Sequence, residues 1–130
     1  MKYKGFSLLE LMIALAVVAI LVSIAYPSYI KFTYKARRAE AQETLMDWAN
    51  RQEIWRADNV AYNGTAGFEP ADTTYFQFAA VTGANSYTLT ATAINDQVND
   101  KQGPVACSTL TLDQAGTRGP DRRCWRQASS

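Results

Sequence analysis

The sequence predicts an α+β fold in which one long N-terminal helix packs by its second half on a small antiparallel sheet. Three observations support this prediction. Residues 6–26 are apolar except for Ser7, Glu10 and Ser23. Residues 28–57 contain neither Gly nor Pro and are rich in helix-forming residues. Segments in which apolar and polar residues alternate then follow, a pattern typical of strands with one buried face.

The apolar run at residues 6–26 is long enough, at about 30 Å as a helix, to cross the core of a bilayer. Lys2 and Lys4 precede the run and favour a cytoplasmic N-terminus, but basic residues just beyond it offset that signal. No A-x-A-like cleavage site follows the run, which argues against an ordinary secretory signal. A carboxylate at the centre of a bilayer costs about 3 kcal/mol or more, so Glu10 requires a compensating role.

Residues 5–12, Gly-Phe-Ser-Leu-Leu-Glu-Leu-Met, resemble the class III signal of type IV pilins and pseudopilins. The resemblance implies that prepilin peptidase cuts between Gly5 and Phe6 and methylates the new amino group of Phe6. It also implies that Glu10 meets the terminal ammonium of a neighbouring subunit and sets the axial register of a filament. Such a cation would offset the cost of burying the Glu10 carboxylate. A plain signal anchor is the alternative interpretation.

The same resemblance divides the chain into a leader that is removed (1–5), a transmembrane and filament-core helix (6–27) and a globular domain (28–130). It implies a single-pass protein of the inner membrane with its domain in the periplasm, which later becomes part of a surface pilus. The implied partners are other pilin subunits, prepilin peptidase, the inner-membrane assembly machinery and the membrane itself.

The second half of the long helix begins after Pro27, which deprives the Ser23 carbonyl of its helical partner and predicts a kink. Apolar and amide side chains then recur at helical spacing and predict the face that packs on the sheet. This face consists of Ala41, Leu45, Trp48, Gln52 and Trp55. We expect Arg38 to be exposed or to face a neighbouring subunit.

Alternating residues predict three strands, at 75–81, 86–93 and 106–112. Their apolar faces would cover the helix and form a core, for which we expect Trp48, Trp55, Phe76, Phe78, Leu89 and Leu110. This arrangement is a pilin roll, the architecture that the resemblance also implies.

Two segments between these elements are predicted to be loops. Residues 58–74 contain Asn63-Gly64-Thr65, which matches a glycosylation acceptor pattern but is more typical of a turn. Residues 95–103 are rich in acidic and amide side chains, yet their spacing does not match a calcium-binding loop. We therefore expect a solvated turn there, with no apolar pocket to raise the pKa of Asp96 or Asp100.

Cys107 and Cys124 are the only cysteines in the sequence. The family resemblance places them in the oxidising periplasm, where the two cysteines of an exported domain are expected to pair. Closing this loop is worth on the order of 3 kcal/mol in the chain-entropy model. A C-terminal disulfide loop is similar to that of type IV pilins, and residues 107–116 with Cys124 and Trp125 look most like PilE-type minor pilins.

The composition offers little that could carry catalysis. The chain has no histidine, and no phosphate-binding Gly-rich loop or metal-ligand set is present in its sequence. We therefore expect a protein that is not an enzyme and needs no cofactor or metal. With 13 basic and 12 acidic residues the net charge is +1, which argues neither for nor against a nucleic-acid partner.

One local patch is strongly basic, and it consists of Arg118, Arg122, Arg123 and Arg126 beside Trp125. Arginines next to an aromatic ring can hold phosphates and stack on bases. Some minor pilins bind DNA through a basic C-terminal region, so DNA is a possible partner. The alternative is that these arginines contact acidic surfaces of neighbouring subunits.

Together these features predict a structural subunit, and specifically a minor one, of a type IV pilus that serves adhesion, twitching motility or DNA uptake. Two alternatives remain. The first is a DNA-binding minor pilin of a natural-transformation pilus. The second is a pseudopilin of a type II secretion system, which the cysteine pair and the missing calcium pattern disfavour.

Overall fold

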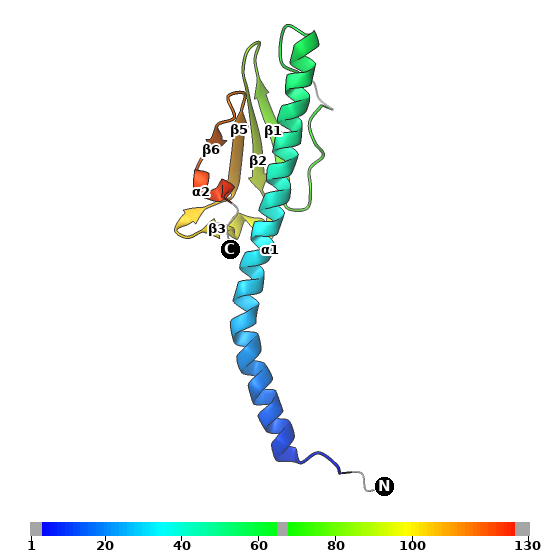
Figure 1. Cartoon of the computed structure of the whole chain (residues 1–130), viewed down its shortest axis with the longest axis vertical. Coiled ribbons are helices and arrows are strands. Elements are labelled where there is room, and N and C mark those ends of the chain that lie inside the picture. Colours follow the sequence, from blue (N-terminus) through cyan, green and yellow to red (C-terminus); the bar gives the residue numbers. More distant parts are fainter. Residues whose placement is uncertain (1–3, 65–67, 127–130) are drawn as a thin grey trace. The chain divides into compact units, whose positions relative to one another are not determined.

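A computed structural model describes residues 4–64 and 68–126 of the chain. The chain divides into two units, Met1–Thr33 and Tyr34–Ser130, and a single helix, α1 (Leu8–Asp58), contributes to both (Figure 1). The sequence predicts one helix from Phe6 to about Ala57, and the observed bounds differ from these by only a residue or two. Pro27 lies inside it and the helix continues on both sides, so the kink stays a prediction.

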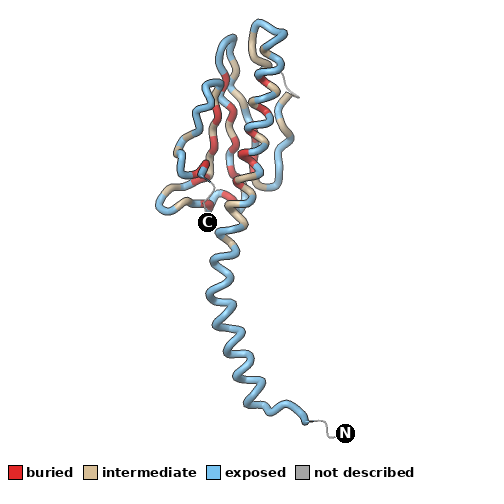
Figure 2. Tube along the Cα trace, in the orientation of Figure 1, coloured by how far each residue is buried: buried red, intermediate tan, exposed pale blue. Residues whose placement is uncertain are grey.

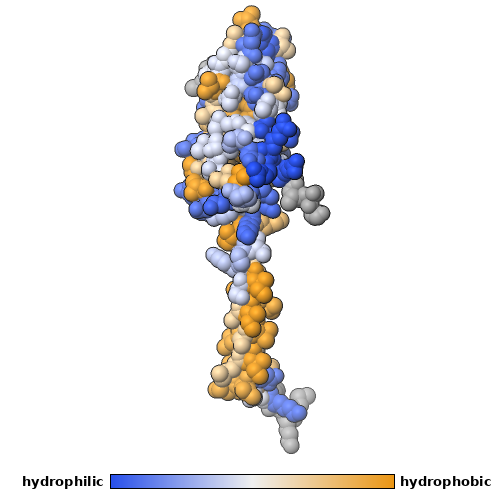
Figure 3. Space-filling view, turned by 90° about the vertical axis from the view of Figure 1, so that its left-hand side faces the viewer, coloured by the Kyte–Doolittle hydropathy of each residue, from blue (hydrophilic) through white to orange (hydrophobic). Residues whose placement is uncertain are grey.

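The first unit consists of the apolar half of α1 and the residues before it. Residues 4–29 are all exposed, and Figure 3 shows the apolar surface that results. Within the described residues, α1 is the one helix that is long and apolar enough to cross a membrane. A surface of this kind requires an apolar environment outside the chain, either lipid or other helices.

The second unit contains a four-stranded antiparallel sheet in the order β1-β2-β5-β6 (Figure 1). Its strands are β1 (Phe76–Thr82), β2 (Tyr87–Ala93), β5 (Thr109–Asp113) and β6 (Arg118–Gly119). The first two predicted strands are confirmed within a residue. The third begins later than predicted, because Ala106 belongs to a separate hairpin and residues 107 and 108 are in no strand. Strand β6 was not predicted.

The core of this unit lies between the sheet and the second half of α1, and Figure 2 shows that both contain buried residues. It contains most of the expected residues: Ala41, Leu45, Trp48, Phe76, Phe78, Leu89 and Leu110. The prediction was wrong for Trp55, which is 40% exposed. The buried face of α1 ends at Gln52, so the Trp55 ring packs instead on Phe68, at 5.9 Å between ring centroids.

The segment that was predicted to be a solvated turn is instead folded against α1. It forms a 3-10 helix, η1 (Asn95–Asn99), and a hairpin of β3 (Lys101–Gln102) and β4 (Val105–Ala106). Gln97 is fully buried, and its Nε2 donates a hydrogen bond to the Tyr34 carbonyl over 3.1 Å. Thr65, the last residue of the glycosylation pattern, lies outside the described residues.

Arg38 of α1 binds the segment of η1 and the β3–β4 hairpin through its side chain. The expectation that Arg38 is exposed or faces a neighbouring subunit was wrong. Only 3% of Arg38 is exposed. Its guanidinium donates to Asp100 Oδ2 over 2.8 Å and to Gln102 Oε1 over 3.0 Å. Burial raises the pKa of the Asp100 carboxyl, and the Arg38 charge partly opposes this shift. The arginine is buried because Asp100, which is just as inaccessible, supplies its counter-charge.

We predict that Arg38→Met destabilises the globular unit by about 3–5 kcal/mol, because it leaves the Asp100 carboxylate buried without its counter-charge. The double variant Arg38→Met, Asp100→Leu removes both charges and should recover most of this loss. Chemical denaturation followed by tryptophan fluorescence measures both free energies of unfolding. A single variant as stable as the parent would show that the pair does not hold η1 and the β3–β4 hairpin in place.

Candidate functional site

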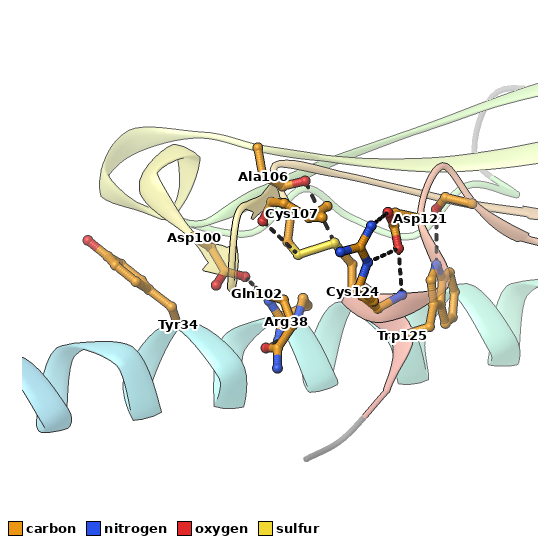
Figure 4. The surroundings of a disulfide bond; sticks show 12 residues. Tyr34, Arg38, Asp100, Gln102, Ala106, Cys107, Asp121, Cys124 and Trp125 are labelled. Atoms are coloured by element: carbon orange, nitrogen blue, oxygen red, sulfur yellow. Dashed lines mark hydrogen bonds and ion pairs between the residues drawn. A yellow bond between two sulfur atoms is a disulfide. The ribbon is translucent and has the colours of Figure 1, made fainter.

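A disulfide joins Cys107, between β4 and β5, to Cys124 in the short helix α2 (Arg122–Trp125) (Figure 4). The two Cα atoms lie 5.5 Å apart, and both residues are fully buried. This is the pairing that the family resemblance implied. It holds the basic C-terminal residues beside the edge of the sheet that β6 forms.

Helix α2 begins at Asp121, whose side chain caps it. Asp121 Oδ1 accepts a hydrogen bond from the backbone N–H of Arg123 over 2.8 Å. The pKa of the Asp121 carboxyl is lowered by that backbone N–H and by the Arg123 guanidinium, which lies 3.2 Å from Oδ2. Arg123 is therefore already paired within the chain, so its charge is less available to a ligand.

Trp125 does not present its ring to solvent, contrary to the expectation that it could stack on bases. It is only 7% exposed, and its Nε1 donates to the Gly119 carbonyl over 3.0 Å. The Arg118 guanidinium lies over the ring, 5.5 Å from its centroid. Trp125 thus links α2 to β6 by a hydrogen bond, and its ring packs against the Arg118 guanidinium.

The remaining arginines surround an open pocket of about 290 Å³. Its lining comprises Gly116, Thr117, Arg118, Arg122, Trp125 and Arg126. Gly116 turns the chain here with a φ of +76°, a value that favours glycine. Arg118, Arg122 and Arg126 are exposed and form no ion pair within the part of the chain that the structure describes. We call these three residues the arginine cluster; its chemistry suits a phosphate or another anion.

The other predicted site residues belong to the N-terminal unit. Gly5 and Phe6 are exposed and precede α1, and Glu10 is exposed in its first turn. Across residues 4–64 and 68–126, no group of three or more Cys, Asp or Glu side chains could hold a metal ion.

The sequence analysis did not single out Gln42, which bonds to the backbone of one of the two disulfide cysteines. Gln42 is 5% exposed, and its Nε2 donates to the Cys124 carbonyl over 2.7 Å. One signal was available, because Gln42 lies one turn after Arg38 and next to Ala41 of the predicted buried face.

Comparison with known proteins identifies the family. Residues 27–111 match the model described as "Type IV minor pilin ComP, DNA uptake sequence receptor", and residues 1–26 match the prokaryotic N-terminal methylation motif. The first match ends before Arg118, so the arginine cluster is an observation independent of it.

Individual relatives agree with this assignment. The "Type IV wide pilus major component PilA4" of Thermus thermophilus is 31% identical over 68% of this chain and 72% of its own length. The "Type IV major pilin protein PilA" of Myxococcus xanthus is 36% identical over 53% of this chain, but the match spans only 33% of that protein. The solved structure of a type IV pilin from Shewanella oneidensis has a TM-score of 0.61 and 29% identity, and the alignment covers 72% of this chain and 99% of that one.

The family match, the long helix on an antiparallel sheet and the C-terminal disulfide agree with one another. The chain belongs to the type IV pilin family, and it is a pilus subunit that assembles with other pilins from a membrane-anchored precursor.

Proposed function

We propose that this chain is a minor pilus subunit that binds DNA during uptake. The observation that carries the proposal is the arginine cluster, in which three exposed guanidinium groups, none with an ion-pair partner among the described residues, line one pocket. The matched family model, whose description names a DNA uptake sequence receptor, supports the same ligand. Because Trp125 is buried, it is not available to stack on bases. The main mode of binding is then contact between the arginines and the phosphate backbone.

The number of free arginines limits the strength of this binding. Three phosphate contacts to duplex DNA give a slope of log affinity against log salt of roughly −2.7. Affinity then falls by about 40-fold between roughly 50 and 200 mM salt. Such binding is weak for one subunit, but several subunits on one filament would raise it by increasing the effective concentration.

We predict that Arg122→Ala with Arg126→Ala reduces the salt slope from roughly −2.7 to roughly −0.9, because one phosphate contact remains. Fluorescence anisotropy of a labelled duplex, titrated with the full chain in neutral detergent micelles, measures this slope. Arg51→Ala with Arg56→Ala removes the same charge from α1 and should leave the slope unchanged. Equal slopes for both variants would mean that the arginine cluster does not contact DNA.

The matched methylation motif supports a second part of the proposal, which concerns maturation. Prepilin peptidase cuts between Gly5 and Phe6, Phe6 is N-methylated, and the inner-membrane assembly machinery takes up the mature chain. Residues 6–27 form the membrane and filament-core helix, and residues 28–130 lie in the periplasm before assembly. Gly5 and Phe6 are exposed ahead of α1, so a peptidase can reach the bond between them.

We expect Gly5→Arg to block this processing, because a large side chain cannot enter a cleavage site made for glycine. Mass spectrometry of the protein isolated from cells shows whether the peptide starting at N-methylated Phe6 is present. Val60→Arg, at a position of the globular unit that is 89% exposed, serves as the control for a nonspecific effect of arginine. Mature protein with an unchanged Phe6 terminus in the Gly5→Arg variant would overturn the cleavage assignment.

Glu10 is the proposed register residue of assembly. It lies in the first turn of α1, where an acidic side chain is favoured by the helix dipole and where the ammonium of a neighbouring Phe6 can meet it. We predict that Glu10→Val leaves the protein stable in the membrane but lowers its amount in sheared filaments at least tenfold. Quantitative mass spectrometry of both fractions provides the test, and normal incorporation of the variant would contradict the register role.

A further inference from the structure

We propose that Gln42 of α1 is a positioning residue for the arginine cluster; this inference rests on the proposed DNA binding. Gln42 Nε2 donates to the Cys124 carbonyl over 2.7 Å in a buried contact. Cys124 lies between Arg122 and Arg126 in the chain. A restraint on its carbonyl is therefore a restraint on the backbone that carries two of the three clustered arginines.

The segment that bears the arginines cannot hold its own conformation. Helix α2 has four residues and β6 has two, and helices this short are not stable in isolation. The carbonyl groups in the last turn of a helix also have no partner within the helix. Gln42 supplies the donor for one of them, and it does so from the long helix that carries one side of the core.

A second connection reaches the same disulfide from the preceding turn of α1. Arg38 pairs with Asp100, and the Asp100 carbonyl accepts a hydrogen bond from the Cys107 N–H over 2.9 Å. Figure 4 shows Arg38 and Asp100 beside the bridge between Cys107 and Cys124. Positions 38 and 42 on one face of α1 thus connect to both ends of the disulfide, directly at Cys124 and through Asp100 at Cys107.

The chain contains a matched control for Gln42. Gln52 is also buried on α1. Its Nε2 donates to the backbone carbonyl of Asn63 over 2.8 Å, and its Oε1 accepts from the backbone N–H of Asn63 over 2.9 Å. Its partner is in the loop that follows α1, whereas the partner of Gln42 is in α2. Gln52→Met therefore removes at least as many hydrogen bonds between a buried α1 glutamine and the backbone as Gln42→Met does, but only Gln42→Met removes one that reaches the segment of the arginine cluster.

The experiment compares the two variants as full chains in neutral detergent micelles, with the parent beside them. The exchange rate of the backbone amide hydrogens in residues 116–126, measured by mass spectrometry, should rise at least tenfold in Gln42→Met. In Gln52→Met the rate there should equal that of the parent. Affinity for a labelled duplex at low salt should fall about fivefold for Gln42→Met alone, with a shallower salt slope because the phosphate contacts no longer form together. Equal exchange in residues 116–126 for the two variants would overturn the proposal.

The two readouts separate this inference from the function it rests on. If the parent does not bind DNA, but Gln42→Met alone loosens residues 116–126, the proposed DNA binding fails and the positioning of the segment stands. If the parent binds DNA through the arginines and Gln42→Met matches it in both exchange and affinity, the positioning role fails. If Gln42→Met does not fold, Gln42→Asn takes its place, because the shorter asparagine amide does not reach the Cys124 carbonyl. Gln52→Asn is then the control.

Discussion

The buried ion pair between Arg38 and Asp100 is the contact on which the arrangement of the C-terminal half depends. Two charges that lose their water are tolerated only when they meet in good geometry, and here the distance is 2.8 Å. The pair fixes the β3–β4 hairpin against α1, and the hairpin leads directly into Cys107. The disulfide between Cys107 and Cys124 then fixes α2, and with it the arginine cluster, relative to the hairpin.

Helix α1 serves two environments, and its sequence changes character between them. Its first half is apolar on every side, as suits a helix surrounded by lipid or by other helices. From Ala41 onward only one face is buried, and the opposite face carries charges such as Glu43 and Asp47. The hydrophobic effect therefore has two consequences for one helix. It drives folding of the globular unit around the second half of α1, and it favours association of the first half with lipid or other helices.

The sequence was sufficient wherever a structure depends on local pattern. The alternation in β1 and β2 and the buried face from Ala41 to Gln52 were predicted correctly, because spacing alone determines which side chains share a face. Arg38 was not, since its partner is 62 positions away and pairing at that range leaves no local pattern. Trp125 was misjudged for a similar reason: β6, which accepts its indole N–H, is too short to show alternation.

Binding and assembly place opposite demands on the same chain. A pocket with three arginines can give only weak and salt-sensitive affinity, because each phosphate contact contributes little at physiological ionic strength. Adding charge to one subunit would strengthen binding but would also increase repulsion between neighbours in a filament. Repetition would avoid this conflict under the proposed function, since several subunits held along one filament would contact one DNA molecule together. The rigidity that we propose for the arginine segment, through Gln42 and Arg38, would then matter more. Each additional contact adds affinity only if it needs no further ordering.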